Sequence, residues 1–378
     1  MWRALIFVAL SAIPAVAQTI ADPSRFTAAM ADFEGSFNAQ PLRCEVTPIR
    51  PMLNFGFRFQ AGYMASVPMS QYLGKGHSLV ILVRVTPEGG TGKPVYLGSR
   101  IRLPEIPRTK TEMEIGGFYL LGEGHYQVAW KMWDESGRVC RKHWKMDARL
   151  THGEHTVKVA LPPETVADLG LNGAPAASPG PDDAPPIRLT VLLHAAPTSP
   201  RRMRLSGRDR QMLLGTLSAL LDRLPARSVR LVVFNLDQQK ELYRDDQFMT
   251  QFLYRVVQSL DTVELGTVDM QVLRNPGGHL DLLTDLIHSE LTSQSPSDVV
   301  VFLGPIARFS DKVPSELLER SGGQAPHFYY IQYRSLMPQP SEFPDVITRA
   351  VARLKGKTLV VHTPGDFAKA IEQVERKQ

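Results

Sequence analysis

IRLTVLLHAAPTSPRRMRLSGRDRQMLLGTLSALLDRLPARSVRLVVFN, residues 187–235, decides the fold of the C-terminal half of the chain. Two short apolar runs, Ile187–Leu193 and Val229–Phe234, predict buried strands. Between them, leucines recur at helical spacing from residue 213 to 224, and Ser206 with Asp209 predicts a capping box at the helix start. A strand, a helix and a second strand in this order predict a βαβ unit.

The same alternation continues to the C-terminus. Apolar runs predict further strands at 241–243, 298–303, 327–333 and 358–362. Helical patterns lie around 248–260, after Gly277-Gly278, and at 345–354, and a last helix follows Thr363 and Pro364. Residues 187–378 are therefore predicted to form an α/β, Rossmann-like domain with a mostly parallel sheet flanked by helices.

Residues 42–165 have a different pattern, with short alternating runs separated by glycine and proline. The clearest hairpin is YQVAWKMW-DESG-RVCRKHWKM, in which Asp134–Gly137 supplies the turn. Several such strands without a long helix predict an all-β sandwich. The sequence Gly124-His125-Tyr126 before the hairpin resembles the tyrosine corner of immunoglobulin-like domains, which implies an immunoglobulin-like sandwich.

Two segments mark the domain boundaries. Residues 1–17 have a positive start, an apolar run and Ala15-Val16-Ala17, which is the layout of a secretory signal peptide; a retained N-terminal anchor is the alternative. A leader, 18–41, precedes the sandwich, and a proline-rich linker, 166–186, follows it. We expect an exported, periplasmic or extracellular protein with no transmembrane span in the mature chain.

The chain contains two cysteines, Cys44 and Cys140. Export favours a disulfide between them, which would stabilise the domain by about 4 kcal/mol in the chain-entropy model. Two buried thiols are the alternative.

The C-terminal half resembles the von Willebrand factor type A domain. The likeness rests on the order of its elements, on VVFN after the first helix and on the closing segment TLVVHTPGDFAKAIEQV, residues 358–374. That family commonly binds a divalent cation at a metal-ion-dependent adhesion site, where a partner supplies a carboxylate.

The ligand positions of that family differ in this chain. Its Asp-x-Ser-x-Ser pattern falls on His194, Ala196 and Thr198, its loop threonine on His279, and its later aspartate on Gly304. Because these changes remove oxygen ligands that a hard cation prefers, the resemblance implies a degenerate site without a metal ion. We predict no cofactor.

A site built on two histidines is the alternative to a degenerate site without a metal ion. His194 and His279 could form a transition-metal site or serve an envelope hydrolase, since imidazole suits zinc and copper. The stretch His152-Gly153-Glu154-His155 lacks the spacing of a zinc-protease helix.

Five arginines follow the first predicted strand: Arg201, Arg202, Arg204, Arg208 and Arg210. They are the candidate contact with an acidic partner, together with His194 and His279. A solvated loop that keeps the protein soluble is the simpler interpretation.

The net charge is +5 and the calculated pI about 9.1. This charge is small for the length of the chain and does not argue for nucleic-acid binding. The sequence also lacks a nucleophile elbow and a phosphate-binding loop. We therefore expect a non-enzymatic protein that binds another protein, or a scaffold component of an envelope assembly.

Overall fold

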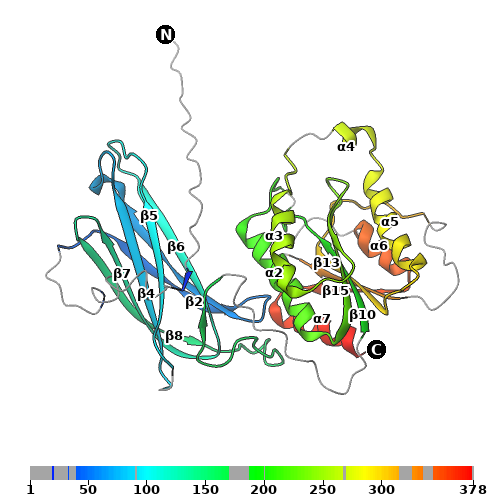
Figure 1. The fold of residues 1–378 in the computed structure, drawn as a ribbon, viewed down its shortest axis with the longest axis horizontal. Helices are drawn as coiled ribbons and strands as arrows, with labels where there is room; N and C mark the ends of the chain where they lie inside the picture. The colour runs from blue at the N-terminus through cyan, green and yellow to red at the C-terminus, as the bar shows by residue number, and fades with distance from the viewer. Residues whose placement is uncertain are drawn as a thin grey trace, which may run out of the picture. The chain divides into compact units, whose positions relative to one another are not determined.

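A computed structural model describes residues 19–20, 33, 40–89, 92–169, 187–199, 201–266, 270–314, 326–334 and 344–376 (Figure 1). The described residues form two compact units. Unit 1 takes its residues from 1–52, 59–149 and 161–173, and unit 2 from 53–58, 150–160 and 174–378. The predicted signal peptide, most of the leader and residues 170–186 of the predicted linker lie outside the described residues.

Unit 1 is built from two sheets. The five-stranded sheet has the order β1-β5-β4-β7-β8, with strands Thr19–Ile20, Val95–Arg102, Ser78–Pro87, Gly124–Asp134 and Val139–Ala148. The four-stranded sheet has the order β2-β3-β6-β9, with strands Glu45–Leu53, Phe59–Pro68, Glu112–Leu121 and Val166–Ala167. A short 3-10 helix, Met69–Gln71, follows β3.

The core of unit 1 lies between its sheets. The rings of Tyr63 on β3 and Trp130 on β7 meet edge to face, with centroids 5.4 Å apart, and both side chains are buried. The buried hydroxyl of Tyr126 donates to the carbonyl of Gly122 at 3.0 Å, which ties the preceding loop to β7 as the sequence suggested. Burial of this hydroxyl raises the pKa of Tyr126 well above its usual value.

The hairpin of β7 and β8 confirms the sequence prediction. Gly137 has φ of +75° and donates its backbone N–H to the carbonyl of Asp134 at 3.1 Å. The Asp134 carboxylate accepts from the backbone N–H groups of Ser136 and Arg138, so the aspartate and glycine together close the turn.

The predicted disulfide is confirmed. Cys44 immediately precedes β2, and Cys140 lies on β8, with a Cα–Cα distance of 6.3 Å. The bridge therefore links the four-stranded sheet to the edge of the five-stranded sheet. Backbone bonds support the same junction, because Leu42 donates to Val139 and Val139 donates to Gln40, both at 2.9 Å.

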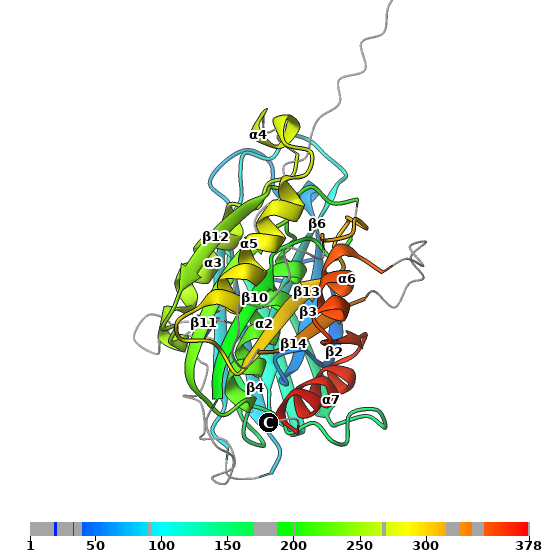
Figure 2. The same ribbon diagram turned by 90° about the vertical axis from the view of Figure 1, so that its right-hand side faces the viewer.

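Unit 2 contains a six-stranded mixed sheet with the order β12-β11-β10-β13-β14-β15 (Figure 2). In that order, the strands are Lys240–Asp245, Ala226–Asn235, Ile187–His194, Val299–Pro305, His327–Tyr333 and Lys357–Val361. Four neighbouring pairs run parallel, while β12 forms an antiparallel hairpin with β11. The central strand β13 is buried along its whole length.

The described helices of unit 2 range from 5 to 17 residues. They are α2 Gly207–Arg223, α3 Leu253–Asp261, α4 Met270–Arg274, α5 Gly278–Thr292, α6 Val346–Arg353 and α7 Pro364–Glu375, with a 3-10 turn at Thr250–Phe252. Two of them begin with capping boxes: Ser206 with Asp209, as the sequence indicated, and Thr363 with Asp366, where the sequence indicated the helix start at Thr363.

Unit 2 also includes the segments 53–58 and 150–160, which lie within the sequence range expected for the β-sandwich. Phe57 stacks on Phe367 of α7 with centroids 5.5 Å apart, and Phe55 lies 6.2 Å from the ring of Tyr333. The guanidinium of Arg223 lies over the ring of Phe57. These aromatic contacts complete the packing around α7.

The predicted fold class, an immunoglobulin-like sandwich joined to a mostly parallel Rossmann-like α/β sheet with flanking helices, is wrong for this chain. Of the residues that the structure describes, 40% are in strands and 24% in helices, and the strands form three sheets, one of them mixed. Alternating apolar and helical patterns suggested repeated βα units. However, the sheet is mixed, because β12, at the predicted strand 241–243, pairs antiparallel with β11, and α3, α4 and α6 have fewer than ten residues each.

Among the described helices, none has both the length and the apolar character needed to cross a bilayer.

Candidate functional site

The carboxyl ends of β10, β11 and β13 lie side by side, because β10 pairs in parallel with both neighbours. The turn after β11 is held by Asn235, whose buried amide donates to the carbonyl of Ala195 at 2.6 Å and accepts from the backbone N–H of Gln238. Hydrogen bonds therefore fix the backbone at this edge of the sheet, where the predicted site residue His194 lies.

His194 ends β10 and is 1% exposed. Its Nδ1 lies 3.2 Å from the carbonyl of Pro305, so Nδ1 carries the proton and donates, and the ring stacks on Phe234. Its Nε2 is buried without a hydrogen-bond partner among the described residues. Burial lowers the pKa of His194, outweighing the opposing effects of Asp237 and Asp345, so the imidazole is neutral near pH 7.

Gly304 explains why His194 is enclosed. The glycine has φ of +155°, and a Cβ placed on it would lie 2.6 Å from the carbonyl oxygen of His194 and 2.8 Å from its Cβ. A side chain is therefore excluded at Gly304, the position where the resemblance placed a lost metal ligand.

His279 is located near the start of α5 and is 5% exposed. Its Nε2 lies 3.0 Å from the carboxylate of Asp311, and its ring stacks on Phe309 with centroids 3.9 Å apart. Each histidine therefore has its own partners. No group of three or more potential metal ligands occurs within the described part of the chain.

The predicted arginines are exposed except for Arg210, which is partly buried, and three of the five have acidic neighbours. Arg204 pairs with Glu264, and Arg210 pairs with Asp261. Arg202 lies 3.9 Å from the carboxylate of the buried Asp209. These pairs neutralise part of the charge that the sequence suggested.

Arg201 and Arg208 are exposed, and no ion pair involves either of them among the described residues. Between these two arginines lies Met203, with 53% of its surface exposed. The backbone carbonyl of Met203 accepts from Leu265, and that of Arg202 accepts from Arg308, so the segment is held in place at two points. We call Arg201, Arg202, Met203 and Arg208 the arginine surface.

Sequence reasoning missed the structural role of Asp209 in holding this segment. The carboxylate, 2% exposed, accepts from the backbone N–H and hydroxyl of both Thr198 and Ser206. Burial raises its pKa, but these hydrogen bonds outweigh burial and hold the pKa of Asp209 below its usual value. The sequence indicated the cap from Ser206, whereas the contact with Thr198 depends on the course of the loop.

Asp345 is a second residue whose role the sequence did not reveal. It caps α6 by accepting from the backbone N–H of Thr348, as its position before the helix suggests. It also accepts from the backbone N–H of Ala307 at 2.7 Å and from the hydroxyl of Tyr330. Asp345 thereby links α6 to the loop that follows β13.

No family model and no curated protein matches this chain. A superoxide reductase (neelaredoxin) from Ignicoccus hospitalis is 14% identical, with 28% of this chain and 80% of that chain covered and a TM-score of 0.20. The putative ApaA protein from Bordetella pertussis is 13% identical over 30% of this chain and 99% of that chain, with a TM-score of 0.21.

A β-glucuronidase from Bacteroides uniformis is 9% identical over 82% of this chain and 38% of that chain, with a TM-score of 0.19. Likenesses this low support no argument about fold or function, and they do not indicate a von Willebrand factor type A domain.

Proposed function

We propose that this chain is an exported, non-enzymatic protein that binds an acidic protein partner through the arginine surface without a metal ion. The observation that carries the proposal is the exposure of Met203, which lies between the exposed Arg201 and Arg208 in the sequence. Arginine and methionine are enriched in protein interfaces, where an apolar centre is surrounded by polar groups.

The fixed backbone of the arginine surface supports the same proposal. The segment is held by Asp209 through Thr198 and Ser206, and by Leu265 through the carbonyl of Met203. A preorganised surface loses less conformational entropy when it binds.

The burial of the two histidines supports a binding protein over the hydrolase alternative. A catalytic base must come within hydrogen-bond reach of its substrate, whereas His194 and His279 are almost fully enclosed. The disulfide between Cys44 and Cys140 supports export, because such bridges persist in oxidising compartments.

The test uses the chain from Gln18 onward, immobilised and exposed to an envelope extract. Replacing Arg201 and Arg208 together by glutamine should weaken partner binding about thirtyfold, because two lost interface arginines at about 1 kcal/mol each cost about 2 kcal/mol. The matched control replaces the exposed Lys357 and Lys369 of the same unit by glutamine, which removes equal charge.

The control variant should retain the partner at wild-type levels, and retention should decrease with added salt. Equal retention by the two double variants would exclude the arginine surface as the contact. Release of the partner by EDTA would exclude metal-independent binding.

A further inference from the structure

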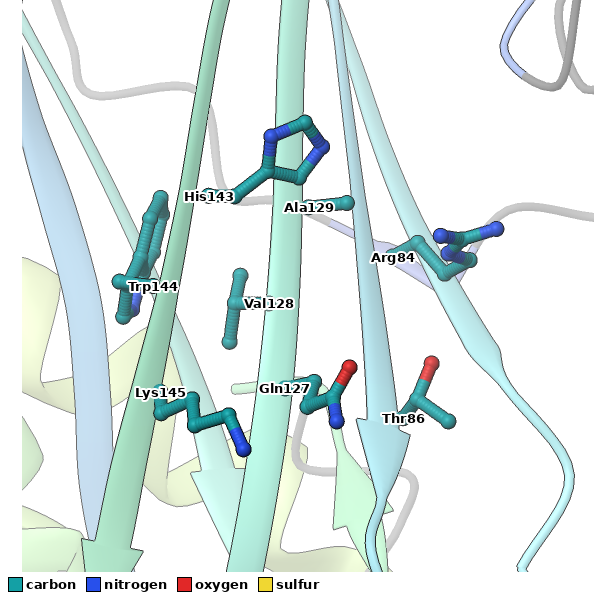
Figure 3. Close-up of a pocket in the computed structure, with 8 residues that line it drawn as sticks. All are labelled: Arg84, Thr86, Gln127, Val128, Ala129, His143, Trp144 and Lys145. Atoms are coloured by element: carbon teal, nitrogen blue, oxygen red, sulfur yellow. The ribbon is translucent and has the colours of Figure 1, made fainter.

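A hollow of about 300 Å³ lies on one face of the five-stranded sheet in unit 1 (Figure 3). Residues of β4, β7 and β8 line it. This volume lies at the lower end of the range for small-molecule sites. The hollow belongs wholly to unit 1 and is independent of the arginine surface.

The strand register explains why the sheet is hollowed there. Arg84 on β4 is opposite Ala129 on β7, which is opposite His143 on β8. The short side chain of Ala129 thus lies between two long ones, and it leaves an open space above the middle strand. Figure 3 shows Ala129 between the other two side chains.

The next row on the same face provides polar groups. Thr86, Gln127 and Lys145 are opposite one another on the same three strands, two residues along from the first row. The hollow therefore combines the cationic Arg84 and Lys145 with an amide, a hydroxyl and an imidazole. None of the described residues lining it is acidic.

A carboxylate beside the hollow shows how these groups hold an anion. One oxygen of Glu88 accepts from the Nζ of Lys145 at 3.0 Å and from the Nε2 of Gln127 at 2.9 Å. The Lys145 side chain is 75% exposed in this ion pair. Because exposed ion pairs contribute little free energy, an incoming anion can replace Glu88 on these two donors.

We propose that the hollow binds a small polyhydroxylated anion, of the sugar-acid or sugar-phosphate class. The carboxylate or phosphate would accept from Lys145 and Gln127 and face the positive charge of Arg84. The hydroxyl groups would bond to Thr86 and His143. A neutral sugar would forgo the charge-assisted hydrogen bonds, which are the stronger contacts.

The test is calorimetric titration of the full chain at low salt with gluconate, glucose 6-phosphate and glucose. We expect one site per chain for gluconate, glucose 6-phosphate or both, with glucose at least about tenfold weaker. The carboxylate and phosphate arms distinguish the two sources of the anion. Absence of binding by both anions, or equal binding of glucose, would overturn the proposal.

Three variants locate the site. Ala129→Leu fills the hollow without changing charge and should abolish binding, whereas Lys145→Gln should weaken it about threefold to fivefold, because Lys145 is exposed. Glu88→Gln removes the competing carboxylate and should tighten binding severalfold, an effect that a damaged fold would not produce. Wild-type affinity in Glu88→Gln and Lys145→Gln would refute the site even if Ala129→Leu did not fold.

The matched control is Lys142→Gln. Lys142 is an exposed residue of β8 opposite the buried Trp130, so it faces away from the row that contains Lys145. The substitution Lys142→Gln removes the same charge from the same strand and should leave the affinity for the anion unchanged. A loss equal to that of Lys145→Gln would mean that overall charge, and not the hollow, attracts the anion.

Discussion

At the residue level, Gly304 sets the environment of His194. We expect Gly304→Ala to lower the free energy of unfolding by about 2–4 kcal/mol, because its Cβ would collide with the backbone of His194 in a strained conformation. Circular dichroism in urea measures this change, since the described helices α2–α7 all lie in unit 2. Gly207→Ala is the control, because no atom lies within 4 Å of its added Cβ. A similar loss in both variants would contradict the steric explanation.

The residue level is also where the sequence predicted least about the candidate site. The order of elements placed His194 near a strand end, and that position is confirmed. His194 is enclosed by the stacked ring of Phe234 and by Gly304, and Gly304 lies on a strand more than one hundred positions later in the chain. Such a contact has no local pattern in the sequence. The partners of Arg204 and Arg210, Glu264 and Asp261, are also far along the chain, 60 and 51 positions away.

At the level of elements, Asp209 connects the cap of α2 to the preceding loop. We expect Asp209→Ala to cost about 2–3 kcal/mol at pH 7, because it leaves the hydroxyls of Thr198 and Ser206 without their acceptor. A carboxylate with a lowered pKa stabilises the fold above its unfolded pKa and loses this contribution as the pH falls through the folded value. The difference between wild type and variant should therefore shrink below about pH 4, where urea unfolding can measure it.

Asp366 is the matched control for Asp209. It occupies the equivalent position in the capping box of α7 but has no second hydroxyl like that of Thr198. Asp366→Ala should cost about 1 kcal/mol. An equal loss at both positions would reduce the role of Asp209 to ordinary capping.

Elements with local signals were the most predictable. The turn at Asp134–Gly137, the capping box of α2 and the start of α7 at Thr363 depend on residues a few positions apart, and the structure confirms them. Strands β2, β3 and β6 were not recognised, because Pro48 and Pro51 interrupt the first and small residues such as Gly62 and Gly116 interrupt the apolar alternation of the other two. The fold class was wrong because strand pairing depends on distant residues that periodicity does not identify.

At the level of the whole molecule, the disulfide joins the two sheets of unit 1. Replacing Cys44 and Cys140 by serine should lower the stability of unit 1 by about 4 kcal/mol, since the unfolded chain loses a constraint over a long loop. Tryptophan fluorescence measures this selectively. After removal of the predicted signal peptide, the remaining tryptophans, Trp130, Trp133 and Trp144, all lie in unit 1. An unchanged fluorescence transition in urea would contradict this role, and the circular dichroism transition of unit 2 serves as the internal reference.

The segment 53–58 limits where the chain can be cut if unit 2 is to be expressed alone. A truncated protein that starts at β10 would contain the whole six-stranded sheet but would lack Phe55 and Phe57. Phe367, fully buried in the intact chain, would lose both aromatic neighbours, and such exposed apolar surface promotes aggregation. A fragment that begins after the proline-rich stretch would therefore be prone to aggregation, even though the pattern of the sequence changes at that point.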